Sequence, residues 1–363
     1  MADRPLKALL VVGETEGGIG RHVAVLAERL GRYGVAAAVC GPASALTAVG
    51  DPPGVGKELL STSRSRPDVV LASRRRLRKL ARGFDVVHAH GLRAGAIAAA
   101  RPATSALVVT WHNAPLTVGR ARRAHAALER YVARCADLTL GASTDLTQAA
   151  MRAGARTAAT TFVVAPPLTP ARRSPEQVRA ELGADDRRIV LAVGRLQAQK
   201  RLDVLVAASS RWAGRSDSPL VVVAGDGPDE ARLRAQITAT AAPVVLLGAR
   251  SDVADLLTVA DVVALPSSWE ARSLVAQEAL RAGVPLVTTA VGGLPELVGD
   301  AALFVPVGDA AALGDALDQV LADHELAGRL AAAGRAQAAG WPSVDDAVAE
   351  LAATYRSLRE STG

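Results

Sequence analysis

The sequence predicts an α/β protein of two Rossmann-like domains, each a parallel sheet with helices on both faces. Short apolar runs alternate with helical patterns throughout the 363 residues, and these runs show no polar alternation. Such strands are typically buried on both faces, as in parallel sheets between helix layers. The length suits two domains that each bury a core, and an apolar fraction of 50% indicates a globular chain.

The expected strands are short apolar runs bounded by glycine or polar residues. In the first half they span residues 7–13, 35–41, 85–90, 106–112 and 137–143. In the second half they span residues 188–194, 220–227, 243–249, 261–267 and 285–293. A helical pattern follows each run, and the first, over residues 18–34, ends at Gly34.

A proline-rich stretch marks the connector between the domains, because proline suits neither central strands nor helix interiors. The prolines are Pro166, Pro167, Pro170 and Pro175. We predict an N-terminal Rossmann-like domain over residues 1–168 and a C-terminal Rossmann-like domain over residues 169–342, facing each other across a cleft. Residues 343–363 have a helical pattern after Pro342, and this helix could cross back to the first domain.

Composition narrows the class of protein. No apolar run reaches the ~20 residues of a membrane span, and the first residues lack the pattern of a secretory signal. The two cysteines, Cys40 and Cys135, lie in apolar surroundings and are expected to pack in the core. We therefore expect a cytoplasmic protein.

Charge is distributed unequally along the chain. Residues 1–183 contain 26 Lys and Arg against 13 Asp and Glu, whereas residues 184–363 contain 16 against 23. This asymmetry predicts that the first half faces an anionic partner. Nucleic acid, an acidic lipid surface and a phosphorylated acceptor are the candidates.

A glycine-rich loop follows the first expected strand. Gly17, Gly18 and Gly20 allow backbone N–H groups to approach an anion at the start of a helix. The dinucleotide fingerprint does not fit, because the spacing differs from G-x-G-x-x-G and the second strand ends in Cys40-Gly41 without an acidic residue. We expect the loop to contact a phosphate or an acceptor, the alternative being an ordinary strand–helix turn.

Two cations follow the first strand of the second domain. Arg195 and Lys200 lie five residues apart after Gly194. An arginine fork and a lysine point charge can bracket a diphosphate, although exposed loop charges are the alternative for the pair alone.

Two carboxylates lie eight residues apart across a later strand-to-helix turn. The turn contains Glu270, Arg272, Ser273 and Leu274. Glu278 falls inside the helix beside an apolar face, where a carboxylate is unfavourable unless it has hydrogen-bond partners. The two hydroxyls of a ribose are suitable partners. A glycine turn, Gly292-Gly293, follows the next strand. These motifs all fall at carboxyl ends of strands, where open α/β sheets bind ligands.

Three histidines fall in two expected strands of the first half. His88 and His90 point the same way from one strand, and His112 ends another. We expect His112 to face the cleft and His90 to lie on the acceptor side. The chain contains neither H-E-x-x-H nor D-x-D, so we expect no metal site.

The combined motifs resemble the retaining family 4 glycosyltransferases, which have the GT-B fold. The resemblance covers essentially the whole chain and is most specific over residues 189–299. The family's E-x7-E pair matches Glu270 and Glu278, and its Arg/Lys pair matches Arg195 and Lys200. Its glycine loop and the histidine of its T-x-H strand match Gly17, Gly18, Gly20 and His112.

The resemblance implies transfer of a sugar from a UDP- or GDP-linked donor to a glycan, lipid-linked or small-molecule acceptor. It makes residues 1–168 the acceptor-side domain and residues 169–342 the nucleotide-sugar-binding domain. The implied catalytic residues are His112, Glu270, Arg195 and Lys200. The expected donor-binding residues are Gly17, Gly18, Gly20, Gly194, Arg195, Lys200, Glu270, Arg272, Ser273, Leu274, Glu278, Gly292 and Gly293. The two cations would neutralise the leaving diphosphate, the first carboxylate would bind the donor sugar, and the second would hold the ribose.

The implied chemistry needs no enzyme nucleophile and no metal or other cofactor. His112 would lie against the donor sugar, and the diphosphate would help to take the acceptor's proton while charge stabilisation supplies most of the rate. The chain departs from the family where Ala271 and Arg272 replace the usual glycine-rich turn, and Arg272 could touch phosphate. Pro166-Pro167-Leu168 replaces the usual P-N-G and would stiffen the hinge.

Two other functions fit part of the pattern. A nucleotide-sugar epimerase would bind the same donor without an acceptor, but the cation pair together with the E-x7-E motif favours a transferase. A non-enzymatic nucleic-acid-binding protein would suit the basic half, but the interleaved aromatics of single-strand binders are missing. We therefore expect no nucleic-acid partner.

Residues 67–82 form a basic helical pattern. Its cations include Arg74, Arg75, Arg78, Lys79 and Arg82, and Leu71, Leu77 and Leu80 are available to pack. Arg120, Arg122 and Arg123 add a second cluster. A solvated helix face is one interpretation. The other is a peripheral contact with anionic lipid or a phosphorylated lipid acceptor at the inner face of the membrane, with Arg74, Arg75 and Arg78 on the acceptor side.

Overall fold

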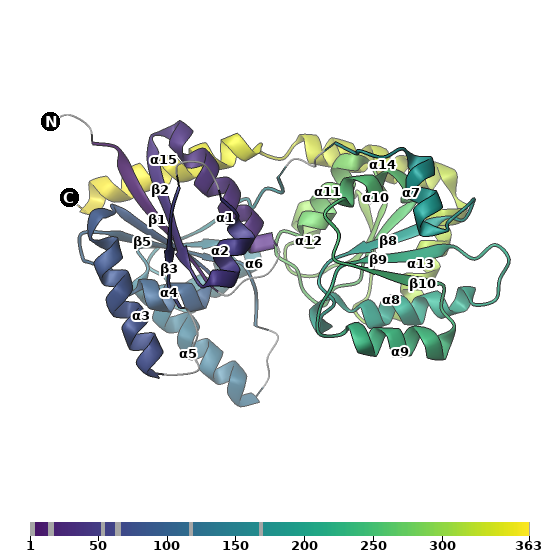
Figure 1. Ribbon diagram of the computed structural model, residues 1–363, viewed down its shortest axis with the longest axis horizontal. Helices are drawn as coiled ribbons and strands as arrows, with labels where there is room; N and C mark the ends of the chain where they lie inside the picture. The colour runs from purple at the N-terminus through teal and green to yellow at the C-terminus, as the bar shows by residue number, and fades with distance from the viewer. Residues whose placement is uncertain are drawn as a thin grey trace. The chain divides into compact units, whose positions relative to one another are not determined.

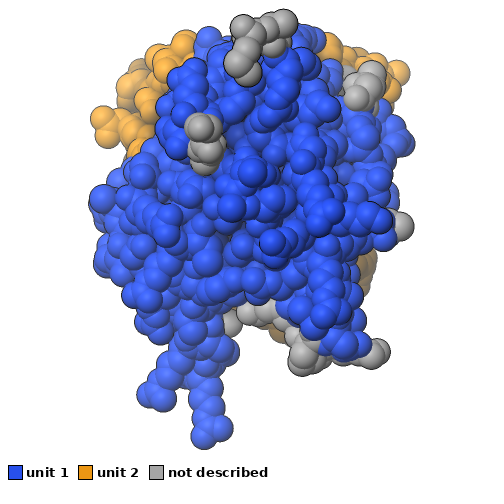
Figure 2. Space-filling model, turned by 90° about the vertical axis from the view of Figure 1, so that its left-hand side faces the viewer, with its two compact units in different colours: residues 1–166, 342–363 blue, residues 167–341 orange. Residues whose placement is uncertain are grey.

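The computed structural model describes residues 4–13, 18–51, 55–61, 67–115, 119–166 and 170–362. The chain divides into two compact units, which are coloured separately in Figure 2. Unit 1 comprises Met1–Pro166 and Pro342–Gly363, and unit 2 comprises Pro167–Trp341. The predicted boundary at residues 168 and 169 falls outside the described residues.

Unit 1 is built on a parallel sheet. Its strands are β1 (Leu6–Val12), β2 (Val35–Gly41), β3 (Gly56–Leu59), β4 (Val86–His90), β5 (Ala106–Trp111), β6 (Leu138–Gly141) and β7 (Ala158–Thr160). Its helices are α1 (Gly18–Arg29), α2 (Ala43–Val49), α3 (Pro67–Leu80), α4 (Leu92–Ala98), α5 (Gly119–Cys135), α6 (Thr144–Arg152) and α15 (Val344–Thr362). The strand order is β3-β2-β1-β4-β5-β6-β7, so the direction of winding reverses between β1 and β4.

Helices cover both faces of this sheet. α1, α2 and α15 share one core with alternate residues of β1, while α3, α4 and α5 lie on the opposite face (Figure 1). Tyr355 of α15 is fully buried, and its hydroxyl contacts His88 Nδ1 at 2.6 Å. Arg29 of α1 forms an ion pair with Asp345. The last helix of the chain is therefore part of unit 1.

Unit 2 repeats the architecture. Its strands are β8 (Ile189–Val193), β9 (Leu220–Ala224), β10 (Val244–Gly248), β11 (Val262–Leu265), β12 (Leu286–Thr289) and β13 (Ala302–Val305). Its helices are α7 (Pro175–Leu182), α8 (Leu202–Ser209), α9 (Glu230–Thr240), α10 (Val253–Val259), α11 (Leu274–Ala282), α12 (Leu294–Val298), α13 (Ala310–Ala322) and α14 (His324–Ala339). The strand order, β10-β9-β8-β11-β12-β13, reverses between β8 and β11.

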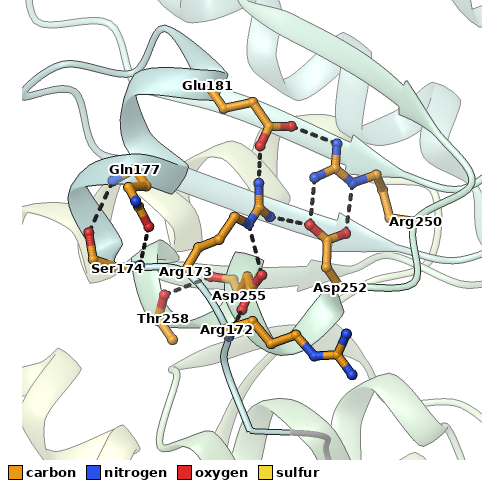
Figure 3. Close-up of polar contacts among 9 residues, drawn as sticks. All are labelled: Arg172, Arg173, Ser174, Gln177, Glu181, Arg250, Asp252, Asp255 and Thr258. Carbon is orange, nitrogen blue, oxygen red and sulfur yellow. Dashed lines mark hydrogen bonds and ion pairs between the residues drawn. The ribbon is translucent and has the colours of Figure 1, made fainter.

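The segment that begins unit 2 is held by a network of ion pairs (Figure 3). The backbone N–H of Arg172 donates to Asp255 Oδ1 at 2.7 Å, and Arg173 Nε donates to Asp255 Oδ2 at 2.9 Å. Arg173 also pairs with Glu181 and Asp252, both of which Arg250 contacts. These hydrogen bonds hold the pKa of Asp255 below its usual range. The C-terminal part of the connector is thus fixed to α10.

The predicted α/β class is confirmed, and every predicted strand is present. Three strands were not predicted: β3, β7 and β13. Each has three or four residues. β3 and β7 contain polar residues and lack a continuous apolar run, whereas β13 is an apolar run, ALFV, that the sequence prediction missed.

Candidate active site

The polar motifs of unit 2 meet at the carboxyl ends of three neighbouring strands. Gly194 follows β8, the loop of residues 266–273 follows β11, and Gly292 and Gly293 follow β12. The winding reverses between β8 and β11, and open α/β sheets typically bind ligands outside the carboxyl ends of the strands at such a point.

Lys200 and Glu270 form the centre of this group. Lys200 Nζ donates to Glu270 Oε1 at 2.6 Å, and Ser267 Oγ donates to the same oxygen at 2.7 Å. The lysine chain lies over Gly194, since a Cβ there would come within 3.3 Å of Lys200 Cε. Gly194 also has φ +152°, so a larger residue would be strained and would displace the lysine.

The turn after β12 supports the backbone of Glu270. Gly293 N–H donates to the Glu270 carbonyl oxygen at 2.9 Å. Gly292 has φ +53°, and a Cβ at this position would stand 2.0 Å from the same oxygen. The close approach of the two loops therefore requires glycine at position 292, and the Gly293 N–H holds the backbone of Glu270 in place.

Helix α11 carries the second carboxylate. Ser273 caps this helix by accepting a hydrogen bond from Ala276 N–H at 3.3 Å, and Leu274 is its first residue. Glu278 is only 1% exposed. Arg281 lies near it, but burial outweighs the carboxylate and lowers the pKa of Arg281. A carboxylate this deep in a helix requires compensating polar partners.

Arg272 joins the loop after β11 to helix α12. Its side chain is 6% exposed and forms an ion pair with Glu296. Burial lowers the pKa of Arg272, and Glu296 opposes that effect. The contact of Arg272 with phosphate stays a prediction.

Arg195 lies in the loop after β8, beside the loop after β9. Leu196 N–H donates to the Asp226 carbonyl oxygen at 2.7 Å, and a Cβ on Gly227 would stand 2.4 Å from the Leu196 carbonyl oxygen. The backbone next to Arg195 is thus fixed against the loop after β9.

A cluster of histidines occupies the corresponding edge of unit 1. His90 Nδ1 lies 3.1 Å from His112 Nε2, and the two rings stack with centroids 5.4 Å apart. The ring of His22, from α1, stands 5.8 Å from each of them. His88 lies beneath, with its Nε2 2.7 Å from Thr110 Oγ1. Sequence reasoning missed His22, although it follows the glycine loop by one helical turn.

Burial keeps these imidazoles neutral. It lowers the pKa of His22 to about 4 and that of His88 to about 3. The pKa values of His90 and His112 also fall well below the usual range, through burial first and neighbouring histidines second. At neutral pH the cluster therefore offers uncharged donors and acceptors.

The glycine loop of unit 1 is described only in part, because Gly17 lies outside the described residues. Gly18 is exposed at the start of α1. Gly20 is buried against α2, where a Cβ would stand 2.8 Å from Ala48 Cβ. Helix packing therefore accounts for Gly20, and anion contact by this loop stays a prediction.

The basic helices α3 and α5 form an exposed surface. Arg75 and Arg78 are exposed, whereas Arg74 stacks on Tyr131 and donates to its hydroxyl at 2.8 Å. Leu77 is buried, but Leu71 is 50% exposed. Leu71 is therefore not used for packing, because its side chain lies on the solvent side of α3.

Within the described ranges no group of three or more His, Cys, Asp or Glu side chains is arranged to hold a metal ion. No helix in the described part of the chain has the length and apolarity needed to span a bilayer.

Solved glycosyltransferases share this architecture. Anabaena HepE in complex with UDP and glucose is 20% identical, with a TM-score of 0.81 over 97% of this chain and 100% of that chain. WaaG, a glycosyltransferase involved in lipopolysaccharide biosynthesis, is 19% identical, with a TM-score of 0.74 over 96% of this chain and 98% of that one. The chain therefore has the GT-B fold.

The sequence matches identify the family within the proteins of GT-B fold. Residues 16–167 match the model described as glycosyltransferase family 4, and residues 174–337 match glycosyl transferases group 1. The chain belongs to glycosyltransferase family 4, which confirms the predicted resemblance.

Two curated relatives illustrate the family. The N-acetyl-alpha-D-glucosaminyl L-malate synthase of Bacillus anthracis is 32% identical over 43% of this chain and 42% of that protein. The D-inositol 3-phosphate glycosyltransferase of Mycobacterium avium is 36% identical over 51% of this chain and 46% of that protein. The chain thus aligns with about half the length of the curated relatives that it matches.

Proposed function

We propose that this protein transfers a sugar from a nucleotide diphosphate sugar to an acceptor hydroxyl, with retention of configuration and without a metal ion. The observation that carries the proposal is the Lys200–Glu270 pair at the switch point of unit 2. It combines a cation suited to a diphosphate with a carboxylate suited to sugar hydroxyls.

Donor binding would rearrange this pair. A diphosphate carries more charge than one carboxylate, so Lys200 would turn to it together with Arg195. Glu270, still held by Ser267 and the glycine turn, would then be available to a sugar hydroxyl. Glu278, buried on α11, is the residue that we assign to the ribose.

Retention would follow from attack on the side of the leaving group. The bond between the anomeric carbon and the diphosphate oxygen breaks, and the acceptor oxygen bonds to the same face of that carbon. The acceptor's proton passes to the departing phosphate oxygen. The two cations stabilise the negative charge that develops there, so no metal ion is needed. The absence of D-x-D from the sequence supports this mechanism.

We favour a UDP-linked donor and a small hydroxylated acceptor with an anionic group. HepE has been solved with UDP-glucose, and the two curated relatives are named for L-malate and inositol 3-phosphate. The basic first half of the chain suits such acceptors, with 26 Lys and Arg against 13 Asp and Glu in residues 1–183.

Thermal unfolding in the presence of nucleotides tests the donor. A ligand at about 100 times its dissociation constant adds roughly 2.7 kcal/mol to stability. We expect UDP and a UDP-sugar to raise the midpoint more than ADP does. Product analysis by NMR with the stabilising donor and candidate acceptors then reports the anomeric configuration. An isomerised donor formed without acceptor would support the epimerase instead.

We also propose peripheral contact between the α3–α5 surface and an anionic membrane. Arg75 and Arg78 are exposed beside Leu71 and Tyr131, which are 50% and 38% exposed. Cations next to exposed apolar side chains suit the boundary between lipid headgroups and acyl chains.

A further inference from the structure

One nitrogen of the histidine cluster lacks a hydrogen-bond partner. His90 is 2% exposed, and its Nε2 is buried without a partner among the described residues. Its other nitrogen, Nδ1, lies 3.1 Å from His112 Nε2. The environment of His90 is therefore asymmetric, and this constrains where its proton can be.

A neutral imidazole carries one proton, so a contact between two such rings has one donor and one acceptor. If His112 donates to His90, the proton of His90 must sit on Nε2, which leaves a buried N–H without an acceptor. If His90 donates from Nδ1, Nε2 is left as an unprotonated acceptor. Among backbone groups, a buried N–H without a partner is rarer than an acceptor without one, and we apply the same order to these rings.

We propose that His90 is a positioning residue that donates its Nδ1–H to His112 Nε2 and so keeps the proton of His112 on Nδ1. This inference deepens the proposed transfer and rests on it. His112 then presents an N–H donor to a substrate oxygen and has no free lone pair with which to act as a general base. The acceptor's proton is left to the leaving phosphate.

The surrounding rings hold His90 in the required plane. His88 lies against it with centroids 4.2 Å apart and an interplanar angle of 32°. His22 meets it edge-on at 73°. His88 is in turn held by hydrogen bonds to Thr110 and to Tyr355, so a residue of α15 helps to hold the cluster in place.

The test reads the tautomer directly. In protein labelled with ¹⁵N-histidine, protonated and unprotonated ring nitrogens have well-separated shifts, and loss of signals in His112→Phe assigns the ring. We expect the wild type to carry the His112 proton on Nδ1. Protonation of His112 on Nε2 in the wild type would overturn the proposal, whatever the activity.

Two variants separate positioning from structure. An aspartate at 90 only accepts, so His90→Asp should move the His112 proton to Nε2 and lower kcat by about 10²-fold, with a smaller effect on KM for the donor. An asparagine amide can donate in place of Nδ1–H, so His90→Asn should keep the wild-type tautomer and most of the activity. A folded His90→Asp protein with wild-type tautomer and kcat would contradict the proposal.

Thermal unfolding measures whether each variant folds. If His90→Asp does not fold, the tautomer of His112 in the wild-type spectrum alone tests the proposal. A protein with the expected tautomer but no transferase activity would remove the proposed function instead. The two failures are therefore distinguishable.

Discussion

Lys200 Nζ and Glu270 Oε1 lie 2.6 Å apart, although the two residues are 70 positions apart in the sequence. The contact joins the loop after β8 to the loop after β11, and Gln199 Nε2 strengthens this junction by donating to the Trp269 carbonyl oxygen at 2.7 Å. An anionic ligand can take the place of Glu270 beside Lys200, and the hydroxyls of a ligand can then bind Glu270.

Removal of the lysine should abolish turnover but not the fold. We predict that Lys200→Ala lowers kcat by at least ~10²-fold, because stabilisation of the leaving group is lost. Glu278→Ala should lower turnover to a similar extent, because the proposed contact with the donor ribose is lost. Lys57→Ala, which removes a lysine from strand β3, is the matched control and should keep wild-type rates. Wild-type activity in purified Lys200→Ala would remove the site assignment.

Chelation should leave activity nearly unchanged. The proposed mechanism gives the diphosphate charge to Arg195 and Lys200, so rates with and without EDTA should agree. Rescue by magnesium or manganese after complete loss in EDTA would replace this mechanism with a metal-dependent one. Lys200→Ala assayed with added magnesium gives a second comparison, and we expect no recovery.

Acid should destabilise unit 1 through its buried histidines. His88 has a pKa of about 3 in the folded protein against 6.5 ordinarily, so below pH 6.5 the unfolded chain binds more protons. The free energy of unfolding is therefore highest above pH 6.5 and falls as the pH drops toward 3. For one such histidine the loss is about 2 kcal/mol at pH 5. Urea unfolding at pH 7.5 and pH 5 measures this difference.

The pH dependence can be assigned with two variants. His22→Asn should lose less stability between pH 7.5 and pH 5 than the wild type, because one buried histidine is gone. His324→Asn changes an exposed histidine of unit 2 and should match the wild type. Equal pH dependence in all three proteins would show that the cluster is not responsible.

The network around Arg173 should matter more to stability than an exposed pair. Arg173→Ala leaves Asp255, which is buried, without its side-chain partner. Arg215 pairs with the exposed Asp217, so Arg215→Ala is the control. We predict a lower unfolding midpoint for Arg173→Ala than for Arg215→Ala, because exposed pairs contribute little.

The sequence predicted the sheets and the unit 2 motifs because both depend on local pattern. Apolar runs mark the central strands, and glycine and charged residues follow them. Contacts between distant segments could not be predicted in this way. His88 meets Tyr355 from 267 residues away, and the ring of His22 on α1 stands 5.8 Å from that of His90 on β4.

The short edge strands show the same limit. β3 has charged residues at two of its four positions, Lys57 and Glu58, so it lacks the apolar run that identifies the central strands. Arg272 shows that the site also has contacts that the sequence does not predict. The sequence predicts a phosphate contact for Arg272 but not its ion pair with Glu296 on α12. Such pairings depend on how loops from different strands converge.

Membrane contact should depend on the α3–α5 surface. We predict that the wild type floats with anionic but not neutral liposomes, and that salt weakens this binding, because each cation near the surface contributes about 1 kcal/mol that screening reduces. Arg74/Arg75/Arg78→Glu should abolish flotation. Tyr131→Ala should weaken it by removing an exposed aromatic side chain.

A control of equal charge change separates local contact from net charge. Arg232/Arg234/Arg329→Glu reverses three exposed cations on α9 and α14, and each of them pairs with a neighbouring carboxylate on its own helix or at its start. If the α3–α5 surface is the contact, this control should float like the wild type. Equal loss in both triple variants would indicate a response to overall charge. Flotation of the α3 variant at wild-type level would place the membrane contact elsewhere and favour a soluble acceptor.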